Sequence, residues 1–531
     1  MTRNRKLLAG VSTLALIAGA GFLYARPLAA EPDGAKDCGS VLPPLPAARA
    51  QSAAPAADAA AAEPNWAQRG GTVNDASCLS RTEVAGVVAV RSEEDVADAL
   101  AFAGAKGLTV SAAGVKHSMG GQAFRRGGVV LDMRGLNRIS LDEARGTVTV
   151  GAGASWHDIQ NAIHPRFAVK AMQSTDIFSV GGSISVNAHG MDHRSGALLG
   201  SIRSLRLMTA DGRVLTVSRE ENGELFRHVV GGYGLFGVIL SAELEVVPND
   251  VYRSERVVIA AGEFPQLYEK IEADPSIGLM YAHLSTAPGS LLEEALVYTY
   301  HKVDEAGLER APLREVGATK LRRLTVNLSK KGSVFKSAKW WAEKHLEHRF
   351  ESCTITRAQA MGDGEACLVS RNDPMHDSVA YLRNALPKET DILHEYFIPR
   401  RRLLPFVAGM KALFEKHDAN LLNASIRAVD AEETALTYAP EKAYSVVLYL
   451  NQKTDAAGTE HMATLTSDLI DLASANGGRF FLPYQLHYSA EQLARAYPEI
   501  GGFFAAKRRF DPEGRFSNSW YARYAPSFTS G

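Results

Sequence analysis

The chain has 531 residues, 46% of them hydrophobic, so it is long enough to bury the cores of two or three domains. Its 58 Lys and Arg residues against 59 Asp and Glu residues give a formal net charge of −1. No overall positive field therefore attracts nucleic acid, whose backbone is bound mainly through concentrated positive charge. We expect an ordinary globular protein without a nucleic-acid partner.

The first 30 residues are typical of an export segment. Residues 7–25 are apolar and uncharged, and Arg3, Arg5 and Lys6 precede them. This length is close to the roughly 20 residues that span a bilayer, while small residues at 25–30 suit a signal-peptide cleavage site. The sequence leaves open whether the segment is a cleaved signal peptide or a membrane anchor. Either one predicts that the rest of the chain lies outside the cytoplasm, in the periplasm.

A linker is predicted at 31–79, because Ala, Pro and Asp dominate it to about residue 64 and cannot offset the entropy of ordering. A first domain is predicted at 80–250, where strands alternate with helices. Ser92 is expected to cap a helix that ends near Gly107. We expect strands at 84–90, 108–114, 127–133 and 147–153, a helix from about Trp156, a long polar loop at 174–196, and paired strands at 201–218 around an Asp-Gly turn.

The second domain is predicted at 251–480, where alternating strands are joined by amphipathic helices at 404–417 and 461–475. It resembles an α+β cap over the first domain. The final segment, 481–531, is rich in turns and aromatic residues, and we expect it to fold back over an earlier domain.

No metal site is expected. The four cysteines, Cys38, Cys78, Cys353 and Cys367, lack a CxxC spacing, although an oxidising compartment would permit disulfides. The basic, aromatic stretch 320–349 is predicted to be an amphipathic helix with a solvated face, and contact with anionic lipid is the alternative. Its histidines lack the companion Glu of a zinc helix.

The most informative segment is SAAGVKHSMGGQAFRRGG, from residue 111. A predicted strand runs into Gly114, and Lys116, His117 and Ser118 follow before a pair of glycines. Such a loop leaves backbone N–H groups free to converge on an anion, and glycine permits close approach. The segment therefore predicts a pyrophosphate-binding loop.

This loop resembles the flavin-binding loop of the vanillyl-alcohol oxidase and p-cresol methylhydroxylase superfamily. The string HSMGGQAF is most similar to the aldonolactone or alditol oxidase and cytokinin dehydrogenase branches. The resemblance implies an α+β fold with a PCMH-type FAD-binding domain, a cap domain for substrate and a C-terminal tail returning to the FAD domain. It also implies FAD as cofactor, with His117 as the candidate for a covalent link to the flavin.

Two further segments resemble the superfamily's cofactor loops. One runs from Gln173 to Gly190, and the other contains Gly232-x-Gly234-x-x-Gly237. A strand-like run follows the latter, so it is not a dinucleotide fingerprint, which requires a helix there. The cofactor-binding residues predicted from all segments are Gly114, Lys116, His117, Ser118, Met119, Gly120, Gly121, Gln122, Ser174, Gly181, Gly182, Ser185, Asn187, His189, Gly234, Gly237, Val238 and, in the tail, Asn518.

Substrate chemistry is expected in the cap. Ser425 and Arg427 share one strand face and resemble the Glu-x-Arg of alditol and aldonolactone oxidases, with Ser425 in place of Glu. Arg427 is a candidate cation beside the flavin, and His487 and Lys453 are further catalytic candidates. Other expected pocket residues are Glu395, Tyr396, Tyr484 and Gln485.

The resemblance implies an FAD-dependent oxidase or dehydrogenase that oxidises a CH–OH group of a small sugar-derived substrate, of the aldonolactone or alditol type. Its electrons would pass to O₂ or to a membrane or periplasmic acceptor. The alternatives are oxidation of a cytokinin-like amine, which needs an acidic residue in the cap, and a membrane-tethered flavin protein that relays electrons without catalysis.

Overall fold

The computed structural model describes residues 26–30, 42–43, 45, 63–303, 310–315, 317–346, 368–379, 382 and 386–528. The apolar run at 7–25 lies outside these residues, as does most of the predicted linker. Within the described ranges, none of the helices combines the length and the apolar character that crossing a bilayer requires.

Three parallel strands and one antiparallel strand form the first sheet, in the order β1-β4-β6-β5. Helix α2 begins after Ser92, whose hydroxyl accepts from the Asp95 N–H while the Asp95 carboxylate accepts from the Ser92 N–H. This reciprocal cap confirms the predicted helix start. The elements are β1 (Trp66–Arg69), β4 (Gly86–Ala89), α2 (Glu93–Ala105), β5 (Val110–Ala113) and β6 (Val129–Asp132), with a separate pair β2 (Thr72–Val73) and β3 (Thr82–Glu83).

The second sheet has the order β11-β10-β12-β8-β7, with β9 beside β12. The predicted turn at Asp211 and Gly212 joins β10 to β11, and Gly212 has the positive φ of 81° that suits glycine there. The glycines before residue 238 lead into a strand, which confirms that they are no dinucleotide fingerprint. The elements are β7 (Ile139–Asp142), β8 (Thr147–Gly151), α3 (Trp156–Ile163), β9 (Phe167–Val169), α4 (Val180–Ser185), β10 (Ile202–Met208), β11 (Val214–Val217), α5 (Gly223–Val229) and β12 (Val238–Pro248).

The region predicted as a loop at 174–196 contains the short helix α4. Its glycines and serines indicated a loop because both residue types are poor helix formers. The helix forms nevertheless, since Val180 and Ile184 on one face are fully buried in the core. Tertiary packing outweighs local propensity here.

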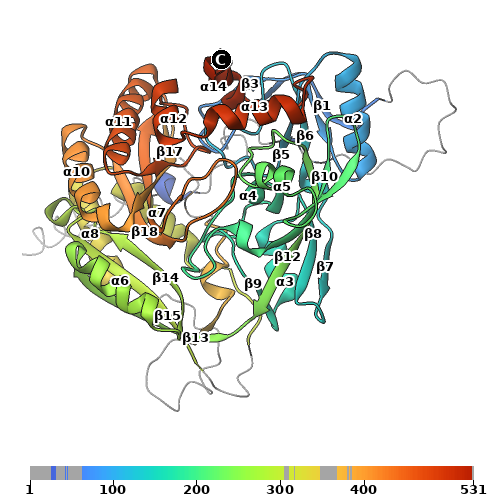
Figure 1. Ribbon diagram of the computed structural model, residues 1–531. Helices are drawn as coiled ribbons and strands as arrows, with labels where there is room; N and C mark the ends of the chain where they lie inside the picture. Colours follow the sequence, from blue (N-terminus) through green and yellow to red (C-terminus); the bar gives the residue numbers. More distant parts are fainter. Residues whose placement is uncertain are drawn as a thin grey trace, which may run out of the picture.

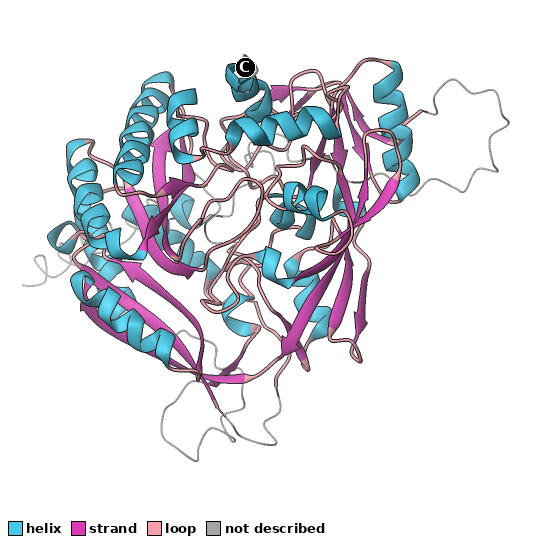
Figure 2. Cartoon of the chain, in the orientation of Figure 1, coloured by secondary structure: helices cyan, strands magenta, loops and turns pink. Residues whose placement is uncertain are grey.

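An eight-stranded sheet forms the cap, in the order β16-β13-β15-β14-β18-β19-β17-β20. Helices α10 and α11 contact one face, and the other face looks toward the two N-terminal sheets (Figures 1 and 2). Its elements are β13 (Val251–Ala260), α6 (Phe264–Ala273), β14 (Ile277–Leu284), β15 (Glu294–Lys302), β16 (Leu368–Ser370), β17 (Glu389–Pro399), α10 (Leu403–Lys416), β18 (Leu421–Val429), β19 (Ala443–Lys453), α11 (Ala456–Ala475) and β20 (Arg479–Phe480).

Two helices stand where the sequence indicated one amphipathic helix at 320–349. They are α7 (Thr319–Ser329) and α8 (Ser333–His345). The break falls at Gly332, whose φ of 147° lies outside the range of a helix. The pair therefore forms a helical hairpin attached to the cap.

The C-terminal segment returns to the first sheet, as predicted. Val110 donates a backbone hydrogen bond to Arg515 and accepts one from Ser517, and the Ser111 hydroxyl donates to the Ser517 carbonyl at 2.6 Å. The helices of this segment, drawn red in Figure 1, are α12 (Ala490–Ala496), α13 (Ile500–Phe510) and α14 (Ser519–Tyr524). The cap is thus inserted within the chain of the N-terminal domain.

Candidate active site

A cavity of about 1290 Å³ lies between the N-terminal sheets and the inner face of the cap sheet. Ligand pockets usually have about 300–1,000 Å³, so this one has room for an extended cofactor together with a substrate. The residues predicted from sequence that line it are Gly114, Lys116, His117, Ser118, Met119, Gln122, Ser174, Gly181, Gly182, Ser185, His189, Gly234, Gly237, Glu395, Ser425, Arg427 and Tyr484.

The first wall is the loop 114–122, which tolerates no larger residue at its glycines. A Cβ added to Gly114 would lie 1.9 Å from the Ser179 hydroxyl, and one on Gly120 would lie 2.5 Å from the Tyr484 carbonyl. Gln122 donates to the carbonyls of Leu482 and Tyr484, at 2.7 and 3.1 Å. The loop is therefore held by a segment that follows the cap, and its close packing against Ser179 and the Tyr484 carbonyl depends on glycine.

The second wall, from residues 173–189, offers unpaired polar atoms. The hydroxyl oxygens of Ser174 and Thr175 are buried, line the cavity and have no hydrogen-bond partner among the described residues. Buried polar atoms without partners are rare, so these two favour a polar ligand in the cavity. The Ser185 hydroxyl, in contrast, already donates to the Gly181 carbonyl at 2.7 Å.

The third wall is the turn at 233–237. Gly234 and Gly237 have φ values of 71° and 145°, and a Cβ on Gly237 would lie 2.8 Å from the Leu207 side chain. Asn518 donates from Nδ2 to the Tyr233 carbonyl at 2.9 Å while its Oδ1 caps α14. Asn518 thus positions this turn from behind rather than lining the cavity.

The inner face of the cap sheet supplies the fourth wall, largely through alternate residues of its strands. Asp391, Leu393 and Glu395 of β17 line the cavity, and so do Ser425 and Arg427 of β18. Alternate residues of a strand share one face, which confirms the expectation that Ser425 and Arg427 point the same way.

A buried polar cluster joins two of these walls. The Glu395 carboxylate lies 2.5 Å from His189 Nε2, accepts from the Ser445 hydroxyl at 2.6 Å and accepts from the Tyr484 hydroxyl at 3.3 Å. His189 and Glu395 are 4% exposed. His189 Nδ1 is buried and has no hydrogen-bond partner among the described residues. With Nε2–H donating to Glu395, Nδ1 is left as a proton acceptor.

The negative charge of Glu395 in this cluster is stabilised by neighbouring positive charge and hydrogen bonds. Burial alone would raise the pKa of Glu395, but the charge and hydrogen bond of His189, the charge of Arg427 and the Ser445 hydroxyl outweigh it and hold that pKa below its usual value. Burial raises the pKa of Tyr484 well above its usual range. Burial also lowers the pKa of Arg427, and Glu395 opposes that effect.

Several predicted residues are not brought to the cavity. Lys453 is exposed at the end of β19, opposite Glu389, and does not line the cavity. His487 lies outside the lining, and burial lowers its pKa to about 4. The other predicted residues that support the walls from behind are Gly120, Gly121, Asn187 and Val238, and Tyr396 and Gln485 line a separate small pocket.

The supporting residues have clear structural partners. The Gly121 N–H donates to the Asp75 carboxylate at 3.0 Å. Asn187 Oδ1 accepts from the Leu199 N–H at 2.9 Å. Ser445 and Asp75 were not foreseen, because each gains its role only from a partner distant in the sequence.

Comparison with known proteins gives a partial match. Residues 84–218 match the family model of the FAD binding domain. A stretch of 173 residues is 37% identical to decaprenylphosphoryl-beta-D-ribose oxidase of Mycolicibacterium smegmatis, covering 32% of this chain and 37% of that protein. Cytokinin dehydrogenase 2 of Arabidopsis thaliana is 33% identical over 164 residues, 30% of this chain and 32% of that protein. The matches thus span about a third of each relative's length.

The matched segment contains the first two walls of the cavity. Its glycine cradle and its unpaired hydroxyls fit a large polar cofactor. The chain therefore carries a PCMH-type FAD-binding domain within an α+β fold, and FAD is its cofactor.

Proposed function

We propose that the protein is an FAD-dependent oxidoreductase that oxidises a CH–OH group of a small sugar-derived substrate of the aldonolactone or alditol type. The observation that carries this proposal is the cluster of His189, Glu395 and Arg427 on the cavity wall. Bound FAD would supply the two-electron acceptor.

The side chains can manage the proton and the charge of this oxidation. A CH–OH group that loses a hydride must also release its hydroxyl proton. We assign the proton acceptor to His189 Nδ1, because Glu395 fixes the Nε2–H tautomer and stabilises the protonated ring. Arg427 places a positive charge at the same wall, where it can stabilise negative charge that grows during the reaction.

Two findings support a sugar-derived alcohol. The 37% identical relative is named for a ribose derivative. The cap wall also carries hydroxyl-binding groups, namely Ser425, Asn423 and Tyr449. Asn and Tyr side chains of this kind fix the orientation of a polyhydroxylated ligand.

Oxidation of a cytokinin-like amine is the second candidate. It is favoured by Glu395, an acidic cap residue that lines the cavity, and by the similarity to cytokinin dehydrogenases. Glu395 already has three hydrogen-bond donors and the charge of Arg427 around it. A carboxylate so fully satisfied is better suited to holding His189 than to binding an amine.

The cofactor link and the location complete the proposal. His117 lines the cavity, packed edge-to-face against Phe178 with ring centroids 5.0 Å apart, and we propose it as the site of a covalent flavin bond. We also propose that the protein works outside the cytoplasm. Cys78 is disulfide-bonded, and such bonds persist mainly in oxidising compartments.

The test is a substrate screen with the purified full-length protein. Flavin bleaching under anaerobic conditions should follow the addition of an aldonolactone or alditol, and not of isopentenyl adenine. Reoxidation by O₂, a quinone or a cytochrome would then identify the acceptor. If only isopentenyl adenine bleaches the flavin, the protein is an amine dehydrogenase and the proposed alcohol oxidation is wrong. If no substrate bleaches the flavin although dithionite reduces it, electron relay without catalysis replaces both proposed oxidations.

A further inference from the structure

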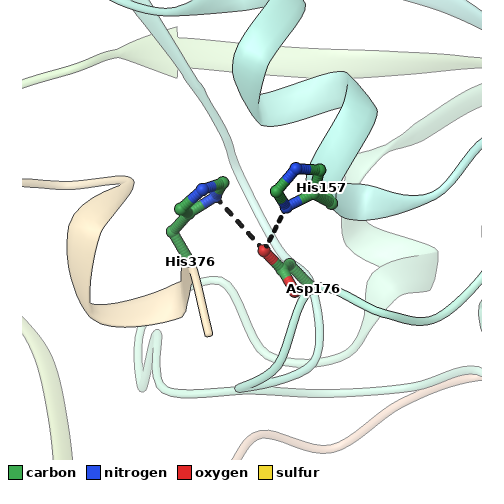
Figure 3. Close-up of side chains that lie close together, drawn as sticks. All are labelled: His157, Asp176 and His376. Atoms are coloured by element: carbon green, nitrogen blue, oxygen red, sulfur yellow. Dashed lines mark hydrogen bonds and ion pairs between the residues drawn. The ribbon is translucent and has the colours of Figure 1, made fainter. Parts of the chain in front are cut away.

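A second cluster of ionisable side chains lies at the edge of the cavity, which His157 lines. Figure 3 shows its members, His157, Asp176 and His376. The Asp176 carboxylate Oδ2 lies 2.9 Å from His157 Nδ1 and 3.2 Å from His376 Nδ1. Asp176 is fully buried and His376 is 3% exposed. The two imidazole rings are nearly parallel, 22° apart, with centroids separated by 4.6 Å. Three side chains that can each supply a metal ligand, from three separate segments of the chain, therefore lie close together.

The donor set suits a borderline divalent cation. Two imidazoles and a carboxylate are common zinc ligands, bound at about 2.0–2.2 Å. One ligand atom from each of the three side chains lies within 4.8 Å of the other two, so small shifts place all three around one ion. Asp176 Oδ1 is buried without a hydrogen-bond partner among the described residues. That second oxygen gives the carboxylate spare capacity for a cation.

One further carboxylate near the cluster could serve as a fourth metal ligand, and two uncharged side chains hydrogen-bond to the cluster. Glu315 Oε1 lies 3.5 Å from His157 Nδ1 and is largely exposed. The Gln160 amide oxygen lies 3.1 Å from His376 Nδ1, and the Ser378 hydroxyl donates to Glu315 at 3.0 Å. Within the part of the chain that the structure describes, the ion pairs of these two carboxylates are with His157 and His376.

We propose that His157, Asp176 and His376 bind a divalent transition-metal ion of the zinc type, with Glu315 or water completing the coordination. This proposal differs from the expectation that the chain holds no metal. The sequence could not reveal the site, because its ligands lie far apart, at positions 157, 176 and 376, and form no recognisable motif. The ion ties helix α3 of the FAD domain to the cap segment after β16. His157 and Asp377 also line the cavity, so the ion lies at its rim.

Zinc titration of the EDTA-treated holoenzyme tests this site. We expect a single zinc ion bound per chain at micromolar zinc, and a rise in Tm with zinc, since a ligand that binds only the folded state stabilises it. Asp176→Asn should abolish both effects, while the control His301→Ala, outside the cluster, should keep them. A conservative second variant, His157→Gln, guards against misfolding, and flavin absorbance reports an intact site. Absence of zinc binding to the wild type, or equal binding by Asp176→Asn, would overturn the proposal.

The helical hairpin α7–α8 carries a second, independent inference. Of eight large hydrophobic side chains exposed in the described residues, four belong to it: Leu321 (54%), Val334 (76%), Phe335 (39%) and Trp341 (55%). Residues 319–346 contain a single acidic residue, Glu343, and eight Lys or Arg, of which Arg323, Lys330 and Lys339 are buried and the other five are exposed or partly exposed. Exposed apolar and aromatic side chains among positive charges are typical of surfaces that lie on anionic lipid.

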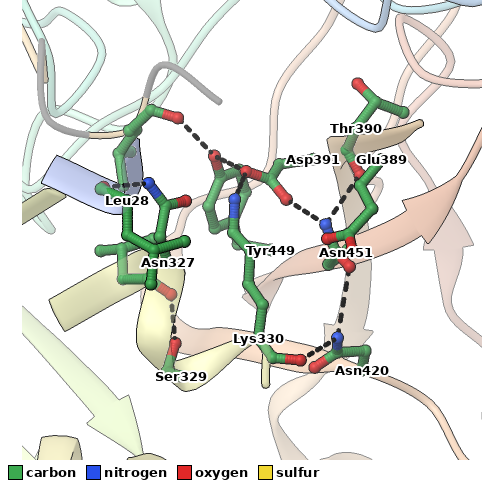
Figure 4. Close-up of polar contacts among 12 residues, drawn as sticks. Leu28, Asn327, Ser329, Lys330, Glu389, Thr390, Asp391, Asn420, Tyr449 and Asn451 are labelled. Carbon is green, nitrogen blue, oxygen red and sulfur yellow. Dashed lines mark hydrogen bonds and ion pairs between the residues drawn. The ribbon is translucent and has the colours of Figure 1, made fainter. Parts of the chain in front are cut away.

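The cavity and the segment 26–30 both reach this hairpin. Leu321 and Val326 of α7 and Ala342 of α8 line the cavity, so the cavity extends between the two helices. Asn327 donates to the Leu28 carbonyl at 2.8 Å (Figure 4), which brings the segment directly after the apolar run onto α7.

We infer that the hairpin rests on an anionic bilayer and that the substrate is amphiphilic, with its polar end in the cavity and its apolar tail between α7 and α8. This deepens the proposed function and rests on it for the chemistry of the polar end. The docking itself is independent of turnover, so its failure is separable from failure of the proposed activity.

Environment-sensitive labels test the docking. The full chain carrying Val334→Cys with an attached fluorophore is mixed with phosphatidylglycerol vesicles whose acyl chains are brominated. We expect quenching at position 334, little with neutral phosphatidylcholine, and none for the control Val214→Cys, which is exposed on β11. Equal quenching at both positions, or none at 334, would overturn the docking.

A second measurement tests the substrate class. For alkyl-chain derivatives of whichever polyol proves active, Leu321→Ser combined with Val326→Ser, at the cavity lining of α7, should raise KM for the long-chain form more than for the short-chain form. Unchanged kinetics for both would contradict the amphiphilic substrate, while the short-chain rate continues to report the proposed activity.

Discussion

His189 Nε2 and Glu395 Oε1 lie 2.5 Å apart, although 206 residues separate them in the chain. One belongs to the FAD domain and the other to strand β17 of the cap. The hydrogen bond spans the boundary between the two domains, so the proton acceptor of the proposed reaction is assembled only when the cap docks.

Glu395→Gln should lower kcat by about 100-fold, a typical contribution of general base catalysis, with little change in KM. The amide keeps the shape but no longer stabilises protonated His189. Steady-state kinetics against Glu389→Gln, near the outer end of the same strand, provide the comparison. Equal rates for the wild type and Glu395→Gln would remove the pair from the mechanism.

The same pair predicts an acid sensitivity. The pKa of Glu395 lies below its ordinary value of 4.5, so its contribution to stability is present above that value and is lost as the pH falls through the lower folded pKa. Denaturation curves should show this loss in the wild type, and a smaller one in Glu395→Gln. Identical loss of stability at acid pH in the wild type and in Glu395→Gln would contradict the lowered pKa of Glu395.

His117→Ala should release the flavin from the denatured protein. In the wild type, a covalent bond would keep yellow colour in the acid-precipitated pellet. In the variant the colour should move to the supernatant, because only non-covalent contacts remain. Absorbance of both fractions is the measurement, and colour in the wild-type supernatant would show that the flavin is not covalently bound.

Lys330→Met should destabilise the cap strongly. Lys330 Nζ lies 2.5 Å from the Asp391 carboxylate, both side chains are buried, and Asn451 and Tyr449 complete the network (Figure 4). Leaving Asp391 unpaired should cost about 3–5 kcal/mol of unfolding free energy. The neighbouring Lys331→Met breaks a partly exposed pair with Glu389 and should cost under about 1 kcal/mol. Urea denaturation distinguishes them, and equal losses would count against the buried pair.

His193 predicts a second pH dependence. It is 4% exposed, neither ring nitrogen has a hydrogen-bond partner among the described residues, and burial lowers its pKa from 6.5 to about 4. As the pH falls, His193 is protonated in the unfolded chain before it is protonated in the folded one. The free energy of unfolding is therefore highest above pH 6.5 and decreases as the pH falls toward 4. His193→Phe should flatten this loss by up to about 3 kcal/mol. Unfolding free energies at several pH values in this window are the measurement, and parallel curves would refute the assignment.

Features set by neighbouring residues could be predicted from the sequence. The cap of α2 at Ser92, the strand after Gly237 and the glycine loop around His117 each depend on a few adjacent positions. Features set by strand register could not. Ser445 meets Glu395 only because β17 and β19 pair at that register, and the same pairing places Lys453 at the strand end, away from the cavity lining.

The return of the C-terminal segment has a consequence for biosynthesis. Gln122, in the flavin loop, is held by carbonyls that lie 360 and 362 residues later in the chain, and strand β5 is completed by Phe516. A nascent chain that still lacks these residues has no finished pocket, however well its first domain has begun to fold. We therefore expect FAD to bind only after these C-terminal residues have been synthesised, and truncation from the C-terminus to weaken FAD binding before it unfolds the cap.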